Sequence, residues 1–173
     1  MIRIFDFLFS LIGLIFLSPL LILIFFIGLF DNGSPLFIQS RVGYNLKFFS
    51  IIKFRTMPMG VRSAATHLNR NIQLSSFGNF LRRTKIDEIP QLLNVFFGDM
   101  SLVGPRPCLF NQRKLISERK KRGIFKVRPG ITGLAQISGI NMQTPTLLAK
   151  TDQKMIKGMN LYNYFYYIFR TIF

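Results

Sequence analysis

The sequence predicts a mainly helical α/β fold that is attached to a membrane from one side. Two observations support this prediction. First, 49% of the 173 residues are hydrophobic, yet the formal net charge is +16, and an ordinary soluble domain rarely combines the two. Second, the apolar residues concentrate at both ends of the chain, with most Lys and Arg residues between them. We therefore expect apolar ends in a bilayer and a basic surface at the lipid–water boundary.

The N-terminal apolar run covers residues 4–30 and is long enough to cross a bilayer. It fits a secretory signal poorly, because it is long and only Arg3 precedes it as a basic residue. Pro19 should kink the helix and free the carbonyl of Ile15, which the hydroxyl of Ser18 can help to satisfy. Because basic residues flank the run on both sides, we favour a re-entrant broken helix over the alternative, a simple span.

A turn at residues 31–35 separates two predicted units. The first is a membrane-embedded re-entrant helix over residues 1–31, and the second is a domain over residues 32–173. Within the second unit, short alternating apolar stretches at residues 36–39 and 48–53 predict a small β-hairpin.

Helices are predicted in the middle of the chain from their capping signals. One runs over residues 87–97, with Gly98 at its C-cap position. Thr84 followed by Asp87 resembles a capping box at its start. A second, highly charged helix is predicted over residues 111–122.

The C-terminal residues 160–173 are dominated by Tyr and Phe. Aromatic residues at this density favour an amphipathic helix at the membrane interface over the alternative, an ordinary core helix. Residues 130–139 are predicted to form a loop and a short strand, and residues 58–76 a polar loop.

Several classes of protein are disfavoured by composition. Cys108 is the only cysteine and His67 the only histidine, which argues against disulfide frameworks, zinc sites and serine-type triads. No GxxxxGK[ST] or GxGxxG element is present. Nucleic acid is the usual partner of a strongly basic chain, but a nucleic-acid-binding protein has no need of the apolar N-terminus. We therefore expect no nucleic-acid partner.

The adjacent carboxylates Asp87 and Glu88 are the most informative candidate site. The positive end of a helix and the flanking Arg82, Arg83 and Lys85 should lower the pKa of both and keep them ionised. An ionised Asp in a basic cleft can attack phosphorus and form an acyl phosphate. The alternative is that Asp87 only caps a helix.

Basic residues on separate segments indicate a phosphate site. Pro105 and Pro107 restrict the backbone on either side of Arg106, and Arg donates two parallel hydrogen bonds to phosphate. Lys53 and Arg55 add further cationic donors, although a solvated surface charge is the alternative for each. A nucleotide diphosphate usually arrives with Mg²⁺, whose protein ligands would be Asp87 and Glu88.

Three strings carry a resemblance to a known family. They are FIQSRVGYNLKFFSIIKFRTM at residues 37–57, LRRTKIDEIPQLLNVFFGDMSLVGPRP at residues 81–107 and VRPGITGLAQISG at residues 127–139. They resemble the bacterial sugar transferases, also called monotopic phosphoglycosyl transferases. The resemblance covers roughly residues 1–139.

The resemblance implies a catalytic core on the cytoplasmic face of the bacterial inner membrane, anchored by a re-entrant helix broken at Ser18 and Pro19. It implies that Asp87 is a nucleophile that takes a phosphosugar from a UDP-sugar, releases UMP and passes the phosphosugar to polyprenyl phosphate. Glu88 would position Asp87 and handle protons, and Mg²⁺ would be required. Membrane lipids are the expected surroundings, and the oligomeric state is left open.

The resemblance also implies phosphate-binding roles for Arg82, Arg106 and Lys53. Arg55 and Gln136 are further candidates for substrate binding. The C-terminal quarter departs from the family pattern at three positions and keeps one, Asp152. The three are Ile140 in place of Arg, Met155 in place of an aromatic residue and Tyr164 in place of Asp.

These positions lie in a region associated with nucleotide and sugar recognition, so the identity of the sugar is left open. The competing function is a catalytically silent, basic, membrane-anchored protein that binds anionic lipid or polymer.

Overall fold

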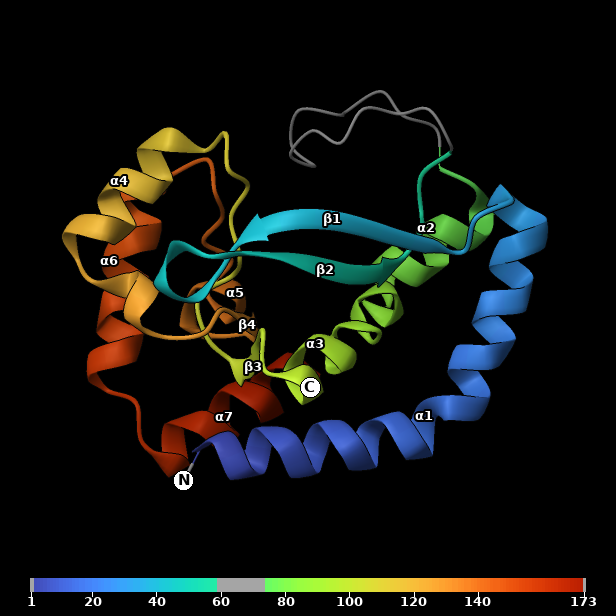
Figure 1. The fold of residues 1–173 in the computed structure, drawn as a ribbon, viewed down its shortest axis with the longest axis horizontal. Helices are drawn as coiled ribbons and strands as arrows, with labels where there is room; N and C mark the ends of the chain where they lie inside the picture. The colour runs from blue at the N-terminus through green and yellow to red at the C-terminus, as the bar shows by residue number, and fades with distance from the viewer. Residues whose placement is uncertain (1, 59–73, 173) are drawn as a thin grey trace.

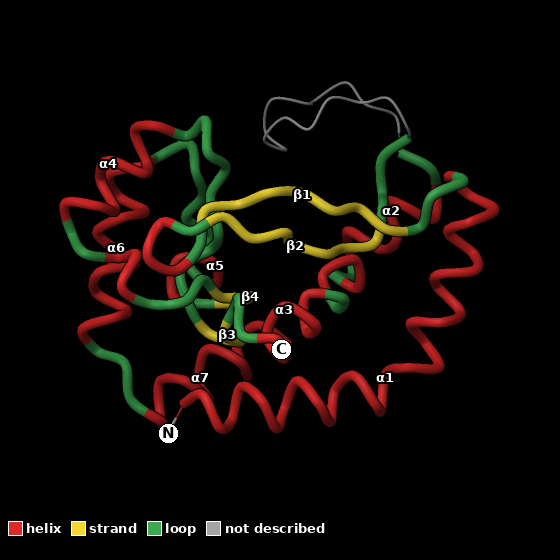
Figure 2. Tube along the Cα trace, in the orientation of Figure 1, coloured by secondary structure: helices red, strands yellow, loops and turns green. Residues whose placement is uncertain are grey.

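The computed structural model describes residues 2–58 and 74–172 and confirms a mainly helical chain with small sheets (Figures 1 and 2). The predicted polar loop falls mostly in residues 59–73, outside the described residues. The helices and strands are α1 (Ile2–Asn32), β1 (Leu36–Val42), β2 (Phe48–Phe54), α2 (Ser76–Arg83), α3 (Gln91–Phe97), β3 (Ser101–Val103), α4 (Arg113–Lys121), β4 (Gly130–Thr132), α5 (Leu134–Ile137), α6 (Pro145–Lys157) and α7 (Leu161–Ile172).

Helix α1 is one continuous helix with Pro19 inside it, and Figure 1 shows it as two arms that meet at a sharp bend. The hydroxyl of Ser18 donates a hydrogen bond of 2.7 Å to the carbonyl of Ile15. This is the acceptor that Pro19 leaves free, so the predicted compensation is present. Among the described residues, α1 is the one helix long and apolar enough to cross a membrane, and only 11% of its most apolar stretch is buried.

The N-terminal arm of α1 is bonded to the rest of the chain through a buried carboxylate. Asp6 accepts hydrogen bonds from the hydroxyl of Ser101 at 3.0 Å, the backbone nitrogen of Leu102 at 2.9 Å and the hydroxyl of Tyr164 at 2.9 Å. A buried carboxylate is stable where several donors satisfy it. Asp6 therefore fixes this arm to β3 and α7.

The C-terminal arm of α1 contacts the same domain at a different place. Ile24 is buried in a cluster with Phe54 of β2 and Leu81 of α2. Near the end of the helix, the hydroxyl of Ser75 donates a hydrogen bond of 2.7 Å to the carboxylate of Asp31. Both arms of α1 are thus held against the body formed by the other described residues, 33–58 and 74–172.

The predicted hairpin is confirmed, with strands longer than expected. Strand β1 pairs antiparallel with β2 from Leu36↔Phe54 to Val42↔Phe48. The turn contains Asn45 with a φ of 51°, a left-handed conformation that Asn tolerates. The hairpin crosses the middle of the molecule in Figure 1.

The helix predicted after residue 86 is divided in two. Residues Ile86–Glu88 form a 3₁₀ turn, and α3 begins only after Pro90. Gly98 ends α3 with a φ of 93°, which confirms the predicted C-cap. The predicted capping box is wrong, because the hydroxyl of Thr84 donates backward to the carbonyl of Phe80 at 2.8 Å and closes α2 instead.

Strands β3 and β4 form a parallel pair that the sequence analysis predicts only in part. Ser101 lies opposite Gly130 and Val103 opposite Thr132. A Cβ on Gly130 would overlap the backbone nitrogen of Gly104, so only glycine fits this approach. The expected strand within residues 130–139 is thus present, and it holds the segment that follows β3.

The C-terminal helix α7 has one buried and one exposed face. Tyr164 is fully buried and Tyr167 is nearly so, whereas Tyr162 and Phe169 are 77% and 58% exposed. One face of α7 is therefore packed as in an ordinary core helix, which was the alternative to an interfacial helix. The other face keeps the exposed aromatic character expected of an interfacial helix.

Helices α4 and α6 pack against each other beside the tip of the hairpin. The predicted charged helix is confirmed as α4, two residues shorter at its start. Helix α6 lies within residues 140–159, for which no element was predicted from the sequence. Its buried side chains are Leu148, Ala149, Asp152 and Met155.

Candidate active site

A pocket of about 890 Å³ brings together residues from the hairpin, the 3₁₀ turn, the segment after β3 and helices α1 and α7. Its described lining carries seven basic and two acidic side chains, which leaves a formal excess of five positive charges. Such an excess favours an anionic ligand. These charged residues are Arg41, Lys53, Arg55, Arg82, Lys85, Arg106, Arg170, Asp87 and Glu88.

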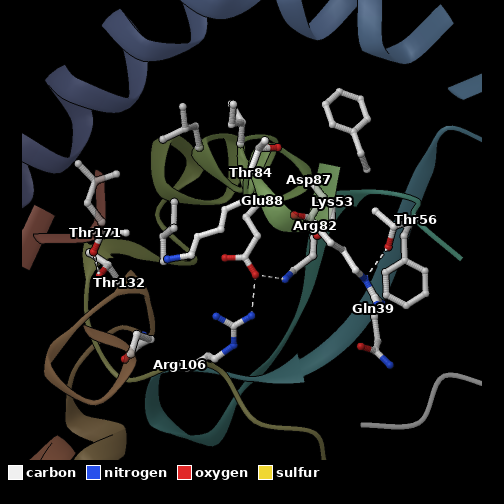
Figure 3. Close-up of a pocket in the computed structure, with 18 of the residues that line it drawn as sticks. Gln39, Lys53, Thr56, Arg82, Thr84, Asp87, Glu88, Arg106, Thr132 and Thr171 are labelled. Atoms are coloured by element: carbon white, nitrogen blue, oxygen red, sulfur yellow. Dashed lines mark hydrogen bonds and ion pairs between the residues drawn. The ribbon is translucent and has the colours of Figure 1, made fainter. Parts of the chain in front are cut away.

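Glu88 is the anion around which two of these cations gather (Figure 3). Its Oε1 accepts a hydrogen bond from Lys53 Nζ at 2.6 Å and another from Arg106 Nη2 at 2.6 Å. Burial alone would raise the pKa of Glu88, but Arg106 and Lys53 outweigh it and lower the pKa to about 2. Glu88 therefore stays ionised and fixes the positions of both cations.

Asp87 lies beside Glu88 in the same turn but is not committed to a partner. Within the described residues it makes no hydrogen bond or ion pair within 4 Å. Burial first, and the charge of Glu88 second, raise its pKa to about 6. This arrangement leaves both carboxylate oxygens of Asp87 available for chemistry.

The lowered pKa predicted for both carboxylates is thus right for Glu88 and wrong for Asp87. The dyad lies in a three-residue 3₁₀ turn and not in the first turn of α3, so the expected helix end is absent there. Burial of Asp87 also outweighs the nearby cations Lys53, Arg82 and Arg106.

Arg82 and Arg55 both line the pocket, as predicted, but their hydrogen bonds differ. Arg82 Nε donates to the hydroxyl of Thr56 at 2.9 Å, which leaves its other nitrogens for a ligand. Arg55 donates to the carbonyls of Ser34 at 3.0 Å and Leu36 at 3.1 Å. Arg55 therefore holds the base of the hairpin as well as facing the pocket.

Gln136 of α5 also lines the pocket. Its Nε2 donates to the carbonyl of Gly104 at 3.3 Å, while its Oε1 is buried without a partner among the described residues. A buried unsatisfied acceptor is costly. Its position in the lining supports the prediction that Gln136 contacts substrate.

Gln39 and Arg41 line the same pocket and were not predicted as site residues from the sequence. Arg41 Nη2 donates to Gln39 Oε1 at 2.6 Å. Burial first, and the neighbouring Arg106 second, lower the pKa of Arg41 to about 10. The register pairs Phe37 with Lys53. Because side chains alternate along a strand, Phe37, Gln39 and Arg41 of β1 lie on the same face of the hairpin as Lys53 of β2. That alternation was the signal available in the sequence.

The three positions that depart from the family pattern are structural in this chain. Met155 and Tyr164 are buried, and Ile140 packs against the core cluster around Leu148. None of the three is among the described residues that line the pocket. Asp152 is also buried and outside the pocket lining.

The carboxylates of the pocket offer few ligands for a metal ion. No group of three or more His, Cys, Asp or Glu side chains within the described ranges is arranged to hold a metal by itself. Mg²⁺ takes one or two carboxylates and completes its shell with phosphate oxygens and waters. Asp87, with both oxygens uncommitted, fits that role, whereas Oε1 of Glu88 is already bound by two cations.

The geometry defines a cationic pocket built around a carboxylate pair, in a chain with one long apolar helix. The chain belongs to the bacterial sugar transferase family, whose sequence pattern matches residues 1–173.

Relatives with curated names agree with this assignment. The chain is 47% identical over 110 residues to the uncharacterized sugar transferase EpsL of Bacillus subtilis, covering 63% of this chain and 54% of that one. It is 42% identical to the undecaprenyl-phosphate glucose phosphotransferase of Komagataeibacter xylinus, covering 79% of this chain but only 27% of that enzyme. It is 32% identical to the exopolysaccharide production protein ExoY of Sinorhizobium fredii, covering 98% of this chain and 83% of ExoY. The chain thus spans about half or less of the first two.

Proposed function

We propose that this protein transfers a sugar 1-phosphate from a UDP-sugar to undecaprenyl or another polyprenyl phosphate, with a covalent phosphosugar on Asp87. Relatives named as glucose and galactose phosphotransferases of undecaprenyl phosphate support the substrate classes. The observation that supports the mechanism is that the two carboxylates of the dyad have different partners. Glu88 holds two cations at 2.6 Å, while Asp87 has no competing partner among the described residues.

In the first step, a carboxylate oxygen of Asp87 attacks the phosphorus atom that carries the sugar. The bond from that phosphorus to the bridging oxygen of the diphosphate breaks, and UMP leaves with the electron pair. The product on the enzyme is an acyl phosphate that still carries the sugar. An uncommitted carboxylate with a pKa of about 6 is ionised at neutral pH and is more basic than an ordinary Asp.

In the second step, a phosphate oxygen of the polyprenyl phosphate attacks the same phosphorus. The acyl–phosphate bond breaks, the carboxylate of Asp87 is restored, and the polyprenyl diphosphate sugar is released. In both steps negative charge moves from the attacking oxygen to the leaving oxygen, on either side of one phosphorus atom. Fixed cations stabilise such charge most effectively where water is excluded.

Lys53, Arg82 and Arg106 are the proposed donors to the reacting phosphates. Lys53 and Arg106 are pre-positioned by Glu88, so little side-chain freedom is lost when the diphosphate binds. Mg²⁺ belongs to the same proposal: Asp87 and the substrate phosphates would hold it, and it would neutralise charge on the diphosphate.

The membrane topology is part of the proposal. Both arms of α1 are held to one domain, through Asp6 at one end and Ile24 with Asp31 at the other. A single span would instead separate these contacts across the bilayer. This supports a re-entrant helix, with the domain on the cytoplasmic face of the inner membrane. A protease-cleavable tag before Arg3 should resist protease added from the periplasm, and cleavage there would refute this topology.

The reaction is tested by UMP release from UDP-sugars by purified wild type and Asp87→Asn, with polyprenyl phosphate and Mg²⁺ present. Release by wild type that Asp87→Asn abolishes is the expected result. A silent anion-binding protein would instead release no UMP, and it would bind anionic lipid at least as tightly after Asp87→Asn, because a negative charge has left a cationic pocket.

A further inference from the structure

The segment Pro105–Pro107 carries the phosphate-binding Arg106 between two residues that have no backbone N–H. Backbone hydrogen bonds to this segment are therefore made mainly through its three carbonyl oxygens. Each of the three accepts a hydrogen bond from a different part of the fold. Pro105 accepts from the backbone nitrogen of Gly130 at 3.0 Å, and Pro107 accepts from Arg41 Nη1 at 3.4 Å. The carbonyl of Arg106 accepts from Arg119 Nη1 at 2.8 Å, the shortest of the three.

Arg119 belongs to α4, and it does not line the pocket. Its side chain is only 2% exposed. A second part of the same guanidinium binds the carboxylate of Asp152 on α6: Nε donates at 3.0 Å, and Nη2 lies 2.7 Å from the same oxygen, Oδ2. Asp152 is fully buried.

The guanidinium of Arg119 on α4 thus joins Asp152 of α6 to the backbone of Arg106, whose own side chain binds Glu88. We propose that Arg119, oriented by Asp152, is a positioning residue that sets the direction of Arg106 toward the reacting phosphate. The proposal rests on the proposed function for its catalytic consequence, but it makes a separate claim about anion binding.

The physical cost of this arrangement is the reason to assign it a task. A buried ion pair is weak evidence for stability, because desolvation of both charges offsets most of their attraction. A fold that needed only to join α4 to α6 would do so with apolar side chains. The guanidinium supplies what apolar side chains lack, a directed donor for the carbonyl of Arg106.

The test replaces the pair without leaving a lone buried charge, in the variant Arg119→Met/Asp152→Leu. Replacement of a buried pair by apolar residues is often tolerated by the fold, so thermal unfolding should stay near wild type. Loss of the donor should lower UMP release about 10- to 100-fold. The matched control is Glu118→Gln/Arg122→Gln, which removes the 2.7 Å pair on the same helix that does not touch Arg106 and should leave activity unchanged.

A double-mutant cycle separates positioning from general damage. In the background Arg106→Ala, the replacement Arg119→Met/Asp152→Leu should cause no further loss, because the side chain that it positions is already gone. An equal loss in both backgrounds would overturn the proposal.

Binding of inorganic pyrophosphate, measured by calorimetry on the solubilised protein, needs no turnover. Its affinity should fall in the pair variant and fall no further when Arg106→Ala is added. If wild type binds pyrophosphate but releases no UMP, the proposed function fails while this inference is still tested. Absence of pyrophosphate binding by wild type would overturn the inference.

A second variant covers the case in which the double replacement does not fold. Arg119→Lys keeps a cation beside Asp152, but one nitrogen replaces the three that contact the carboxylate of Asp152 and the carbonyl of Arg106. Pyrophosphate affinity should therefore fall about 10-fold with little change in thermal stability. Wild-type affinity in this variant would refute the role of Arg119.

Discussion

The pH dependence of the first half-reaction follows from the unequal titration of the dyad. In the proposed mechanism Asp87 attacks only when it is ionised, and its pKa is raised to about 6 by burial and by the charge of Glu88. An acid with this pKa is roughly nine-tenths ionised at pH 7 and roughly one-tenth ionised at pH 5. The rate should therefore fall about 10-fold between these two pH values, and most of the fall should lie near pH 6.

The assay must isolate the nucleophile from the lipid acceptor, because a phosphate monoester also titrates near pH 6. We therefore propose rapid-quench measurement of the UMP burst without polyprenyl phosphate. Each enzyme molecule can then form one covalent phosphosugar. The burst rate reports Asp87, while the burst amplitude reports the fraction of folded enzyme at each pH.

A control variant checks the physical cause of the shift. Glu88→Gln removes the negative charge that is the second cause of the raised pKa of Asp87. The midpoint of the burst rate should therefore move to lower pH, even though the maximal rate also falls. A wild-type rate that is constant between pH 7 and pH 5, or a midpoint that moves upward in Glu88→Gln, would refute this reasoning.

Three further predictions test other parts of the structure. Lys53→Met should lower the burst rate about 100-fold, because it removes a cation that the proposed mechanism places beside the reacting phosphate. Exposed Lys126→Met is the control, and an equal loss in both variants would contradict the assignment. Gly130→Ala should destabilise the fold by roughly 2 kcal/mol, because the added Cβ would overlap the backbone of Gly104. In the control Gly158→Ala, the nearest atom to the added Cβ is 3.5 Å away, so this variant should unfold thermally like wild type. Asp6→Ala should destabilise the purified protein by at least about 3 kcal/mol in thermal unfolding, because three donors lose their acceptor; an unchanged midpoint would show that this bond network is dispensable.

Local signals predicted the local parts of the fold. Strand alternation predicted the hairpin, and Gly98 predicted the end of α3. Pro19 and Ser18 predicted the bend of α1 and the hydrogen bond from Ser18 to Ile15. Each of these depends on residues close together in sequence. The parallel pairing of β3 with β4 joins residues 29 positions apart in its first pair, Ser101 and Gly130. Neither three-residue strand is long enough for its own periodicity to predict the pairing.

The site shows the same division between local and long-range information. The dyad, Lys53 and Arg106 lie together in the structure, as the basic segments of the sequence and the family resemblance both indicated. Burial does not follow from local sequence. A lowered pKa was therefore predicted for Asp87, whereas burial raises it. For the same reason Arg119, which is charged and lies in a highly charged helix, carries no sequence signal of its buried role.

The apolar part of the pocket lining connects the bend of α1 to the proposed chemistry. Leu17, two residues before Pro19, lines the same pocket as Asp87, together with Leu92 of α3 and Ile168 of α7. A water-soluble donor needs only the cationic part of such a pocket, whereas a polyprenyl acceptor must present its phosphate without drawing its hydrocarbon chain into water. A bend that keeps apolar α1 beside the pocket meets this requirement, because the lipid chain can stay against apolar side chains while its phosphate meets the cations. A straight span would carry the second half of α1 away from the domain and would give up the contact of Ile24 with the base of the hairpin.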